Sequence, residues 1–193
     1  MKRALLSSYT KDEALLSLAR LLERHDWSLW GSAGSAKYLS DNHIPCRDIA
    51  ELIGPPILEH RVVSLSRKLY AALLTLSPKD LEVLDRLGIR PIGLVYVTLY
   101  PLEEATANPK IKPEEVIDKT DIGGPTLLRA AAKGGRIVIS DPSQIDMVAS
   151  WLDNGATEYE RARMVAKLRA AAERRVADYV DASARYWESQ VNR

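Results

Sequence analysis

Three short polar turns carry the residues that are best suited to bind an anion. They span residues 7–11, 31–37 and 121–126, and we expect each to follow a strand and to precede a helix. Backbone N–H groups at a helix N-terminus, together with serine hydroxyls, favour a phosphate or a carboxylate, and Lys11 adds a full positive charge to the first turn. Taken singly, each turn is more typical of a simple helix cap, because glycine and serine are common there.

The elements that would position these turns alternate between strand and helix. Apolar, partly β-branched runs predict strands at residues 4–6, 27–30, 46–49, 92–99 and 136–140. Helical spacing predicts helices at residues 15–22, 36–39, 77–87, 113–117, 123–133, 143–152 and 157–187. Residues 50–75 fit no single pattern, and 69–76 suit either a helix or a buried strand.

Helix starts are marked by paired polar residues. Thr10 stands three residues before Glu13, and Thr157 three residues before Glu160, which is the spacing of a capping box. Ser77 is followed by a proline, another typical helix start. Strands alternating with helices predict a three-layer α/β domain with a mostly parallel sheet, followed by a C-terminal helical extension. In such sheets ligands bind beyond the carboxyl ends of the strands, where the three turns should meet.

Composition narrows the function classes. The 193 residues include 27 Lys plus Arg and 26 Asp plus Glu, a net charge of +1, so no charge argument favours nucleic acid or an anionic membrane. The single cysteine, Cys46, excludes an intrachain disulfide, and three histidines with one cysteine are a poor source of a structural zinc site. The apolar run after Met1 is too short for a signal peptide or a membrane span, so we expect a cytoplasmic protein.

Several motifs resemble one family. Residues 120–133, TDIGGPTLLRAAAK, closely resemble the IDIGG-x-T-x-x-RAAAK motif of inosine monophosphate cyclohydrolases, which have the methylglyoxal-synthase-like fold. Residues 97–101, VTLYP, resemble that family's N-L-Y-P motif, and residues 31–37, GSAGSAK, its S-G-G-T-A-K phosphate loop. Ser7 and Lys11 fall where the family has an S-x-S-D-K segment. The basic helix at residues 160–179 resembles the segment that joins the family's two catalytic halves, and we expect no transformylase half in this chain.

The resemblance implies a function and a set of residues. The implied reaction closes a formamido-imidazole-carboxamide ribotide to inosine monophosphate with loss of water, in purine synthesis and without a metal or redox cofactor. The implied phosphate-binding residues are Ser7, Lys11, Ser32, Gly34 and Ser35. The implied catalytic residues are Lys133, Tyr100, Asp121 and Arg61, and we expect Gly123, Gly124 and Ser64 beside the base.

The same resemblance implies an organisation. It implies a nucleotide-binding domain of the methylglyoxal-synthase-like fold over residues 1–153 and the helical extension over residues 154–193. The expected ligand is a purine or imidazole ribonucleotide monophosphate. A homodimer is implied too, and the apolar residues of the long helix favour it: Tyr159, Ala162, Val165, Ala166, Leu168 and Ala172. A separate transformylase is a further possible partner, whereas nucleic acid and membrane are not expected.

The sequence departs from the family where chemistry is expected. The family's R-V-K-T-L-H-P motif reads RVVSLSR at residues 61–67, so its lysine is Val63 and its histidine and proline are Ser66 and Arg67. Thr98 replaces the asparagine of N-L-Y-P. Arg67 and Lys68 are nearby cations that could compensate. The departures keep a second hypothesis open, a catalytically impaired module that binds a purine nucleotide; a methylglyoxal-synthase-type lyase is less favoured because the 14-residue motif matches the cyclohydrolases better.

Each candidate residue also has a purely structural interpretation. Tyr100 could be a core residue with a satisfied hydroxyl, Lys133 a lysine that favours a helix C-terminus, and Asp121 a simple helix cap. We expect His25, His43 and His60 to be surface residues without a catalytic role. Cys46 has apolar neighbours and is more typical of packing than of a nucleophile.

Overall fold

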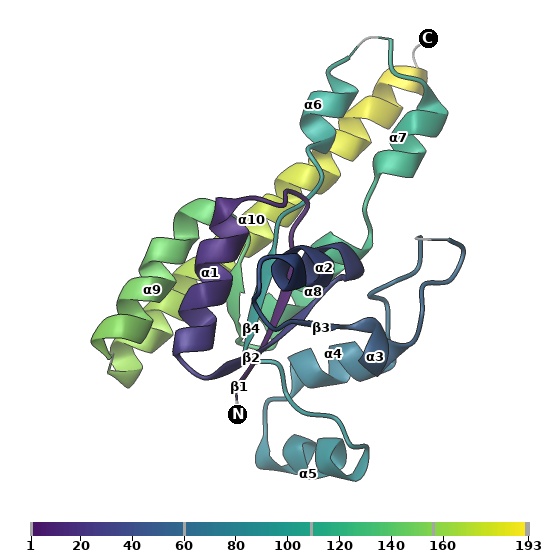
Figure 1. The fold of residues 1–193 in the computed structure, drawn as a ribbon. Coiled ribbons are helices and arrows are strands. Elements are labelled where there is room, and N and C mark those ends of the chain that lie inside the picture. Colours follow the sequence, from purple (N-terminus) through teal and green to yellow (C-terminus); the bar gives the residue numbers. More distant parts are fainter. Residues whose placement is uncertain (1, 60, 109, 156, 192–193) are drawn as a thin grey trace.

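The computed structural model describes residues 2–59, 61–108, 110–155 and 157–191 (Figure 1). Five strands form one sheet in the order β3-β2-β1-β4-β5, and every pairing between neighbours is parallel. The strands are β1 (Lys2–Ser7), β2 (Trp27–Gly31), β3 (Arg47–Asp48), β4 (Leu94–Val97) and β5 (Ile137–Ile139). All residues of β4 and β5 are buried, as expected for strands that are covered on both faces. The prediction of an α/β fold with a parallel sheet is confirmed.

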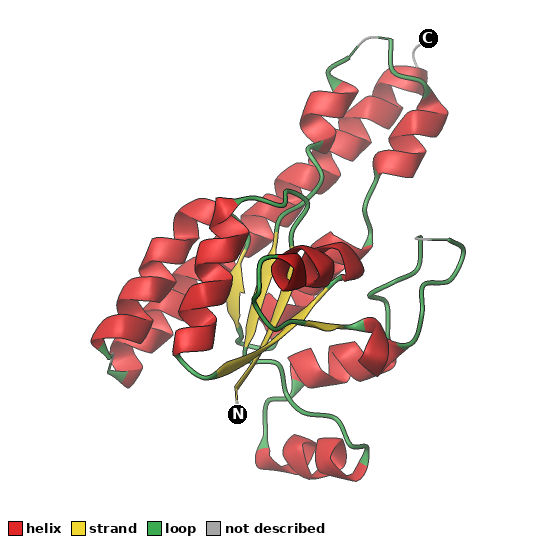
Figure 2. Cartoon of the chain, viewed as in Figure 1, coloured by secondary structure: helices red, strands yellow, loops and turns green. Residues whose placement is uncertain are grey.

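Helices lie on both faces of the sheet (Figure 2). On one face α1 packs on β2 and α9 packs beside α1, whereas α8 packs on β4 and β5 with α4 beside it. The described helices are α1 (Glu13–Arg24), α2 (Ala33–Asp41), α3 (Ala50–Ile53), α4 (Arg67–Leu74), α5 (Pro78–Arg86), α6 (Leu102–Thr106), α7 (Pro113–Lys119), α8 (Gly123–Lys133), α9 (Ile145–Asn154) and α10 (Glu158–Val191), with a 3₁₀ turn at Pro142–Gln144. Residues 69–76 are thus mostly helical, and α6 was not expected.

Two of the three predicted helix starts have the expected side-chain contacts. Asp80 N–H donates to Ser77 Oγ at 3.2 Å and the Asp80 carboxylate accepts from Ser77 N–H at 2.9 Å, and Thr157 and Glu160 form the same reciprocal pair at the start of α10. The prediction for Thr10 is wrong. Asp12 caps α1 instead, because it directly precedes the first helical residue and its carboxylate accepts from Leu15 N–H at 3.1 Å.

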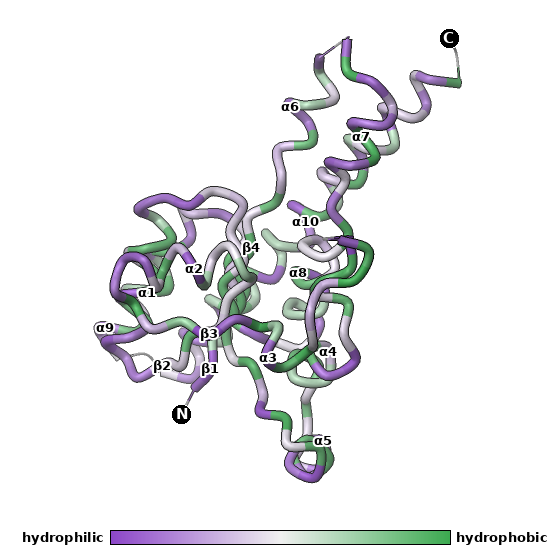
Figure 3. Tube along the Cα trace, turned by 45° about the vertical axis from the view of Figure 1, so that its right-hand side comes forward, coloured by the Kyte–Doolittle hydropathy of each residue, from purple (hydrophilic) through white to green (hydrophobic). Residues whose placement is uncertain are grey.

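The long helix α10 packs along β5 and α8 and continues past the sheet, where α6 and α7 lie beside it (Figure 1). An ion pair of 3.0 Å between Arg175 and Glu103 ties α10 to α6. In Figure 3 the hydrophobic segments gather around β4 and α8 in the middle of the molecule. The inner face of α10 joins this core through Met164, Val165, Leu168, Ala172, Val176, Tyr179, Ala182 and Tyr186.

This packing changes the argument for a homodimer. Val165, Leu168 and Ala172 were part of the apolar surface that favoured a second copy, yet they are buried within one chain. Tyr159, by contrast, is 71% exposed. The homodimer therefore stays a prediction that rests on the family resemblance rather than on the apolar content of α10.

Candidate functional site

A cavity of about 680 Å³ opens where β1 and β4 end. A smaller cavity of about 190 Å³ adjoins it, and Ser7, Arg61 and Asp121 line both. The remaining residues around the larger cavity are Ser8, Tyr9, Val97, Thr98, Tyr100, Ile117, Asp118, Lys119, Thr120, Ile122 and Trp187. The smaller cavity is also lined by Leu5, Ser32, Ile49, Val63, Ser64, Leu65, Leu69, Gly123, Gly124 and Leu127. Residues from all three polar turns thus meet at the carboxyl edge of the sheet, as such sheets favour. The first two turns follow β1 and β2 as expected, but the turn at residues 121–126 follows α7, so the prediction that it follows a strand is wrong.

A hydroxyl network fixes the strand ends beneath the cavities. Ser8 N–H donates to Ser35 Oγ at 3.0 Å, and Ser32 Oγ lies 3.2 Å from the same oxygen. The hydroxyls of Ser8 and Thr98 are 2.9 Å apart, and Tyr9 N–H donates to Thr98 Oγ1 at 2.7 Å. Since Ser35 is fully buried, its hydroxyl holds the turns after β1 and β2 together. Thr98, which departs from the family's asparagine, joins β4 to the turn after β1.

The start of α2 lies beside the first turn. A side chain at Gly31 would bring its Cβ within 2.9 Å of Ala36 N, so this residue must be glycine for α2 to approach the end of β2 so closely. Lys11 extends over Gly34, where a Cβ would lie 3.4 Å from Lys11 Cε. The Lys11 ammonium donates to the carbonyls of Ser8 and Tyr9, and its removal from water lowers its pKa. A cation therefore stands next to helix N–H groups that have no intrahelical partner.

Of the five residues assigned to phosphate, the structure places two in the cavity walls. Ser7 lines both cavities and Ser32 the smaller one. The other three line neither cavity. Ser35 contacts Ser8 and Ser32 through its hydroxyl, and Lys11 lies beside Gly34 at the start of α2. The group thus gathers around one helix N-terminus, although it comes from two different turns.

Asp121 caps α8 and faces both cavities. Its carboxylate accepts hydrogen bonds from Gly123 N–H at 2.8 Å and from Gly124 N–H at 2.9 Å. A Cβ on Gly124 would lie 2.4 Å from Asp121 Oδ2 and 2.7 Å from Leu99 Cδ2, and one on Gly123 would lie 2.5 Å from Ser64 Oγ. Both glycines therefore leave the space that the Asp121 carboxylate and Ser64 occupy. The Asp121 carboxylate therefore caps α8 and also lines the two cavities.

Tyr179 on α10 holds the loop that carries Asp121, and sequence reasoning missed it. Its hydroxyl accepts from Asp121 N–H at 2.8 Å and lies 3.4 Å from the carbonyl oxygen of Lys119, to which it donates. The residue is only 2% exposed, and burial raises the pKa of its phenol, which keeps the hydroxyl protonated. The helical extension thus positions the site, and the only sequence signal was a tyrosine at an apolar helical position.

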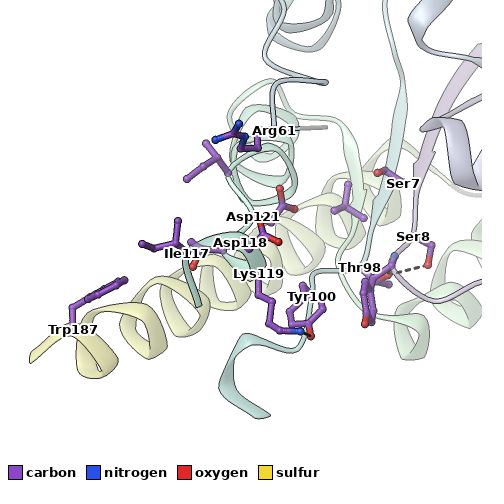
Figure 4. A pocket seen from close by; sticks show the side chains of 14 residues that line it. Ser7, Ser8, Arg61, Thr98, Tyr100, Ile117, Asp118, Lys119, Asp121 and Trp187 are labelled. Carbon is purple, nitrogen blue, oxygen red and sulfur yellow. Dashed lines mark hydrogen bonds between the residues drawn. The ribbon is translucent and has the colours of Figure 1, made fainter. Parts of the chain in front are cut away.

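Tyr100 lies in the larger cavity among side chains that the sequence did not single out (Figure 4). Lys119 Nζ donates to the Tyr100 hydroxyl at 2.9 Å and lies 5.1 Å from the centre of its ring. The Tyr9 ring meets the Tyr100 ring edge-on, with 4.8 Å between centroids. The hydrogen bond to Tyr100 raises the pKa of Lys119, which favours its charged form. Trp187, from the end of α10, lines the same cavity beyond Ile117, away from Tyr100 (Figure 4).

Of the two candidate catalytic cations, Arg61 lines the cavities and Lys133 does not. Arg61 lines both, with Nε donating to the carbonyl of Leu58 at 3.4 Å. Lys133 is an exposed residue at the far end of α8, roughly 15 Å along the helix axis from Gly123 at 1.5 Å per residue. It lines neither cavity. Within one chain, therefore, Tyr100, Asp121 and Arg61 come together and Lys133 does not join them.

The remaining candidates lie elsewhere. His25 pairs with Asp153 at 2.7 Å and His43 is exposed, whereas His60 lies outside the described residues. Burial raises the pKa of the Cys46 thiol to about 12, which suits packing better than nucleophilic attack. In the described part of the chain no three His, Cys, Asp or Glu side chains cluster as a metal site would require. Nor does any helix in that part have the length and apolarity to cross a membrane.

Comparison with known families agrees with this fold. The model of the MGS-like domain matches residues 14–126, more than half of the chain. The chain therefore belongs to the MGS-like domain family.

Two curated proteins and one solved structure are similar to most of this chain. The bifunctional purine biosynthesis protein PurH of Brachyspira hyodysenteriae is 37% identical over 171 residues, which cover 86% of this chain and 33% of that protein. PurH of Rhodospirillum rubrum is 37% identical over 198 residues, covering 99% of this chain and 37% of the relative. The chain thus spans about a third of the length of these curated relatives. A solved structure, the crystal structure of ForH, superposes with a TM-score of 0.80 at 28% identity and covers 96% of this chain and 98% of its own.

Proposed function

We propose that this chain is an inosine monophosphate cyclohydrolase of purine biosynthesis. The observation that carries the proposal is the meeting of Tyr100, Asp121 and Arg61, all from motifs shared with the cyclohydrolases, around one pair of cavities. The relatives whose printed name is a purine biosynthesis protein support the same pathway. The substrate would be the formylated imidazole-carboxamide ribotide, held by its 5′-phosphate near Ser7, Ser32 and the start of α2.

Ring closure needs two groups held together and two protons moved. The carboxamide nitrogen attacks the formyl carbon, a C–N bond forms, and the carbonyl electron pair moves onto the formyl oxygen. In our proposal Asp121 takes a proton from the carboxamide nitrogen and Tyr100 gives one to the oxygen. The hydroxyl then leaves as water with the proton held by Asp121, while the formamido N–H returns a proton to Tyr100. Both side chains end as they began, and Arg61 favours negative charge on the oxygen.

The geometry supports some of the residue roles that the family resemblance implies and does not support others. Gly123, Gly124 and Ser64 line the smaller cavity, which suits contact with the base or the ring that closes. A role for Lys133 would need a contact that a single chain does not provide. The cytoplasmic location, the homodimer and a separate transformylase remain parts of the proposal that rest on the family resemblance.

The phosphate assignment predicts that inosine monophosphate binds far more tightly than inosine. Lys11→Ala should weaken binding of the monophosphate by about 1.5–3 kcal/mol, because a hydrogen bond to a charged group is lost. Inosine, without a phosphate, should bind equally to both forms. Isothermal titration calorimetry with the two ligands measures this difference.

A matched control is Lys79→Ala on α5. Lys79 is exposed and lines neither cavity, so its loss should leave affinity unchanged. Equal affinity of the parent protein for inosine and for its monophosphate would contradict the phosphate assignment.

A further inference from the structure

The larger cavity holds one lysine whose side chain is already engaged with a candidate catalytic group. Among the described residues that line the two cavities, only Arg61 and Lys119 carry a permanent positive charge. Lys119 Nζ donates to the Tyr100 hydroxyl at 2.9 Å, and Figure 4 shows its side chain reaching toward that oxygen. The contact puts a positive charge next to the hydroxyl that the proposed reaction uses as a proton donor.

The other candidate cations are placed less well for this task. Val63, where the similar motif has a lysine, lies in the wall of the smaller cavity and brings no charge. Arg67 and Lys68 are exposed at the start of α4 and line neither cavity. Lys119 therefore fills a chemical need that the sequence left open, from a position that no motif indicated.

The backbone of Lys119 is fixed independently of its side chain. Lys119 ends α7, its carbonyl accepts a hydrogen bond from the buried Tyr179, and Tyr179 also binds Asp121 N–H at 2.8 Å. One residue of α10 thus sets the positions of Lys119 and Asp121 relative to each other. If Lys119 only stabilised the C-terminus of α7 through the helix dipole, its charge would need only to lie near the helix end. The hydrogen bond that fixes its backbone would not be required for that interaction.

We propose that Lys119 is a positioning residue that acts through Tyr100, orienting its hydroxyl and stabilising the phenolate that forms when Tyr100 gives its proton to the formyl oxygen. The proton balance is the one described above, and Lys119 stays protonated throughout. The inference rests on the proposed cyclohydrolase function. A preorganised charge beside a developing anion is the kind of group whose removal slows the chemical step more than binding.

The test is a double-mutant cycle of Lys119→Met and Tyr100→Phe, with steady-state turnover of the formylated ribotide as the readout. Lys119→Met should lower kcat on the order of a hundredfold, the scale for one preorganised group. Its KM should stay within about threefold, because the removed interaction acts in the transition state. The double variant should be no slower than Tyr100→Phe alone, because residues that act as a unit are not additive.

Two controls separate this role from a structural one. Lys110→Met removes an exposed lysine just before α7 that lines neither cavity, and its kcat should equal that of the parent. Lys119→Arg keeps the charge and should recover most of the lost rate. An unchanged kcat in Lys119→Met, or additive losses in the cycle, would overturn this inference while the parent still turns over. A parent protein without turnover would instead refute the proposed function and the inference with it.

Discussion

Gly124→Ala is expected to destabilise the protein and to remove its activity, although alanine is normally the better helix residue. In an ordinary helical position this change stabilises by roughly 0.5–1 kcal/mol. Here the new Cβ would lie 2.4 Å from Asp121 Oδ2 and 2.7 Å from Leu99 Cδ2. Overpacking of this kind costs about 1–3 kcal/mol, and Tm should fall by roughly 2–12 °C. Displacing the Asp121 carboxylate by about 1 Å should lower kcat about a hundredfold.

Thermal unfolding and turnover measured on the same preparation test this result. Arg129→Ala, also on α8, is the matched control because Arg129 is exposed and forms only a surface pair with Glu173 at 3.1 Å. That control should change stability by no more than about 0.5 kcal/mol and leave kcat alone. A Gly124→Ala protein that is as stable and as active as the parent would show that the start of α8 does not confine Asp121 as described.

Asp121→Asn should abolish most turnover while leaving monophosphate binding nearly intact. The amide cannot accept the carboxamide proton, and loss of such a general base typically costs on the order of a hundredfold to ten-thousandfold in rate. Each Asp121 oxygen accepts one of these bonds, so in the same orientation the NH2 group of asparagine would face either Gly123 N–H or Gly124 N–H and leave it unpaired. Binding should persist because Ser7, Ser32 and the start of α2 are unchanged.

Asp80→Asn isolates the catalytic part of that effect. Asp80 also accepts from two backbone N–H groups, those of Leu76 and Ser77 at 2.8 and 2.9 Å, both on its Oδ2 atom. It lies on α5 and lines neither cavity. Asp80→Asn should lose little stability, because one amide oxygen can keep both bonds and asparagine caps a helix about as well as aspartate. Asp121→Asn should lose about 1–3 kcal/mol, the scale of one unpaired N–H group. Only Asp121→Asn should lose turnover. Equal rates in the two variants would mean that Asp121 is a cap and nothing more.

The sequence predicted the parts of the site that local rules control. Parallel strands all end at one edge, so the polar turns after β1 and β2 could be expected to meet there. The turn at residues 121–126 follows α7, so its place at this edge depends on tertiary packing. The paired glycines that begin α8 and the aspartate two residues before them were visible as a motif, and their contacts are local. The helix starts at Ser77 and Thr157 followed from capping chemistry in the same way.

The sequence could not predict the contacts that depend on where α10 comes to lie. Tyr179 reaches Asp121 across 58 residues, and Trp187 reaches the larger cavity from the last turns of the same helix. Nothing in the mixed charge of that helix indicated which face would be buried against α8 and α6. The contact between Lys119 and Tyr100 spans only 19 residues, but it depends on how α6 and α7 fold back. These residues escaped attention because their partners are set by tertiary packing rather than by spacing.

The central claim is that this chain closes the imidazole-carboxamide ring, and one measurement addresses it directly. The purified protein is mixed with the formamido-imidazole-carboxamide ribotide, and inosine monophosphate is followed by chromatography against a reaction without protein. The account predicts formation of inosine monophosphate with repeated turnover, and a loss of that activity in Asp121→Asn. Tight binding of the monophosphate without any product, in the parent protein as in Asp121→Asn, would contradict the account and show a nucleotide-binding module instead.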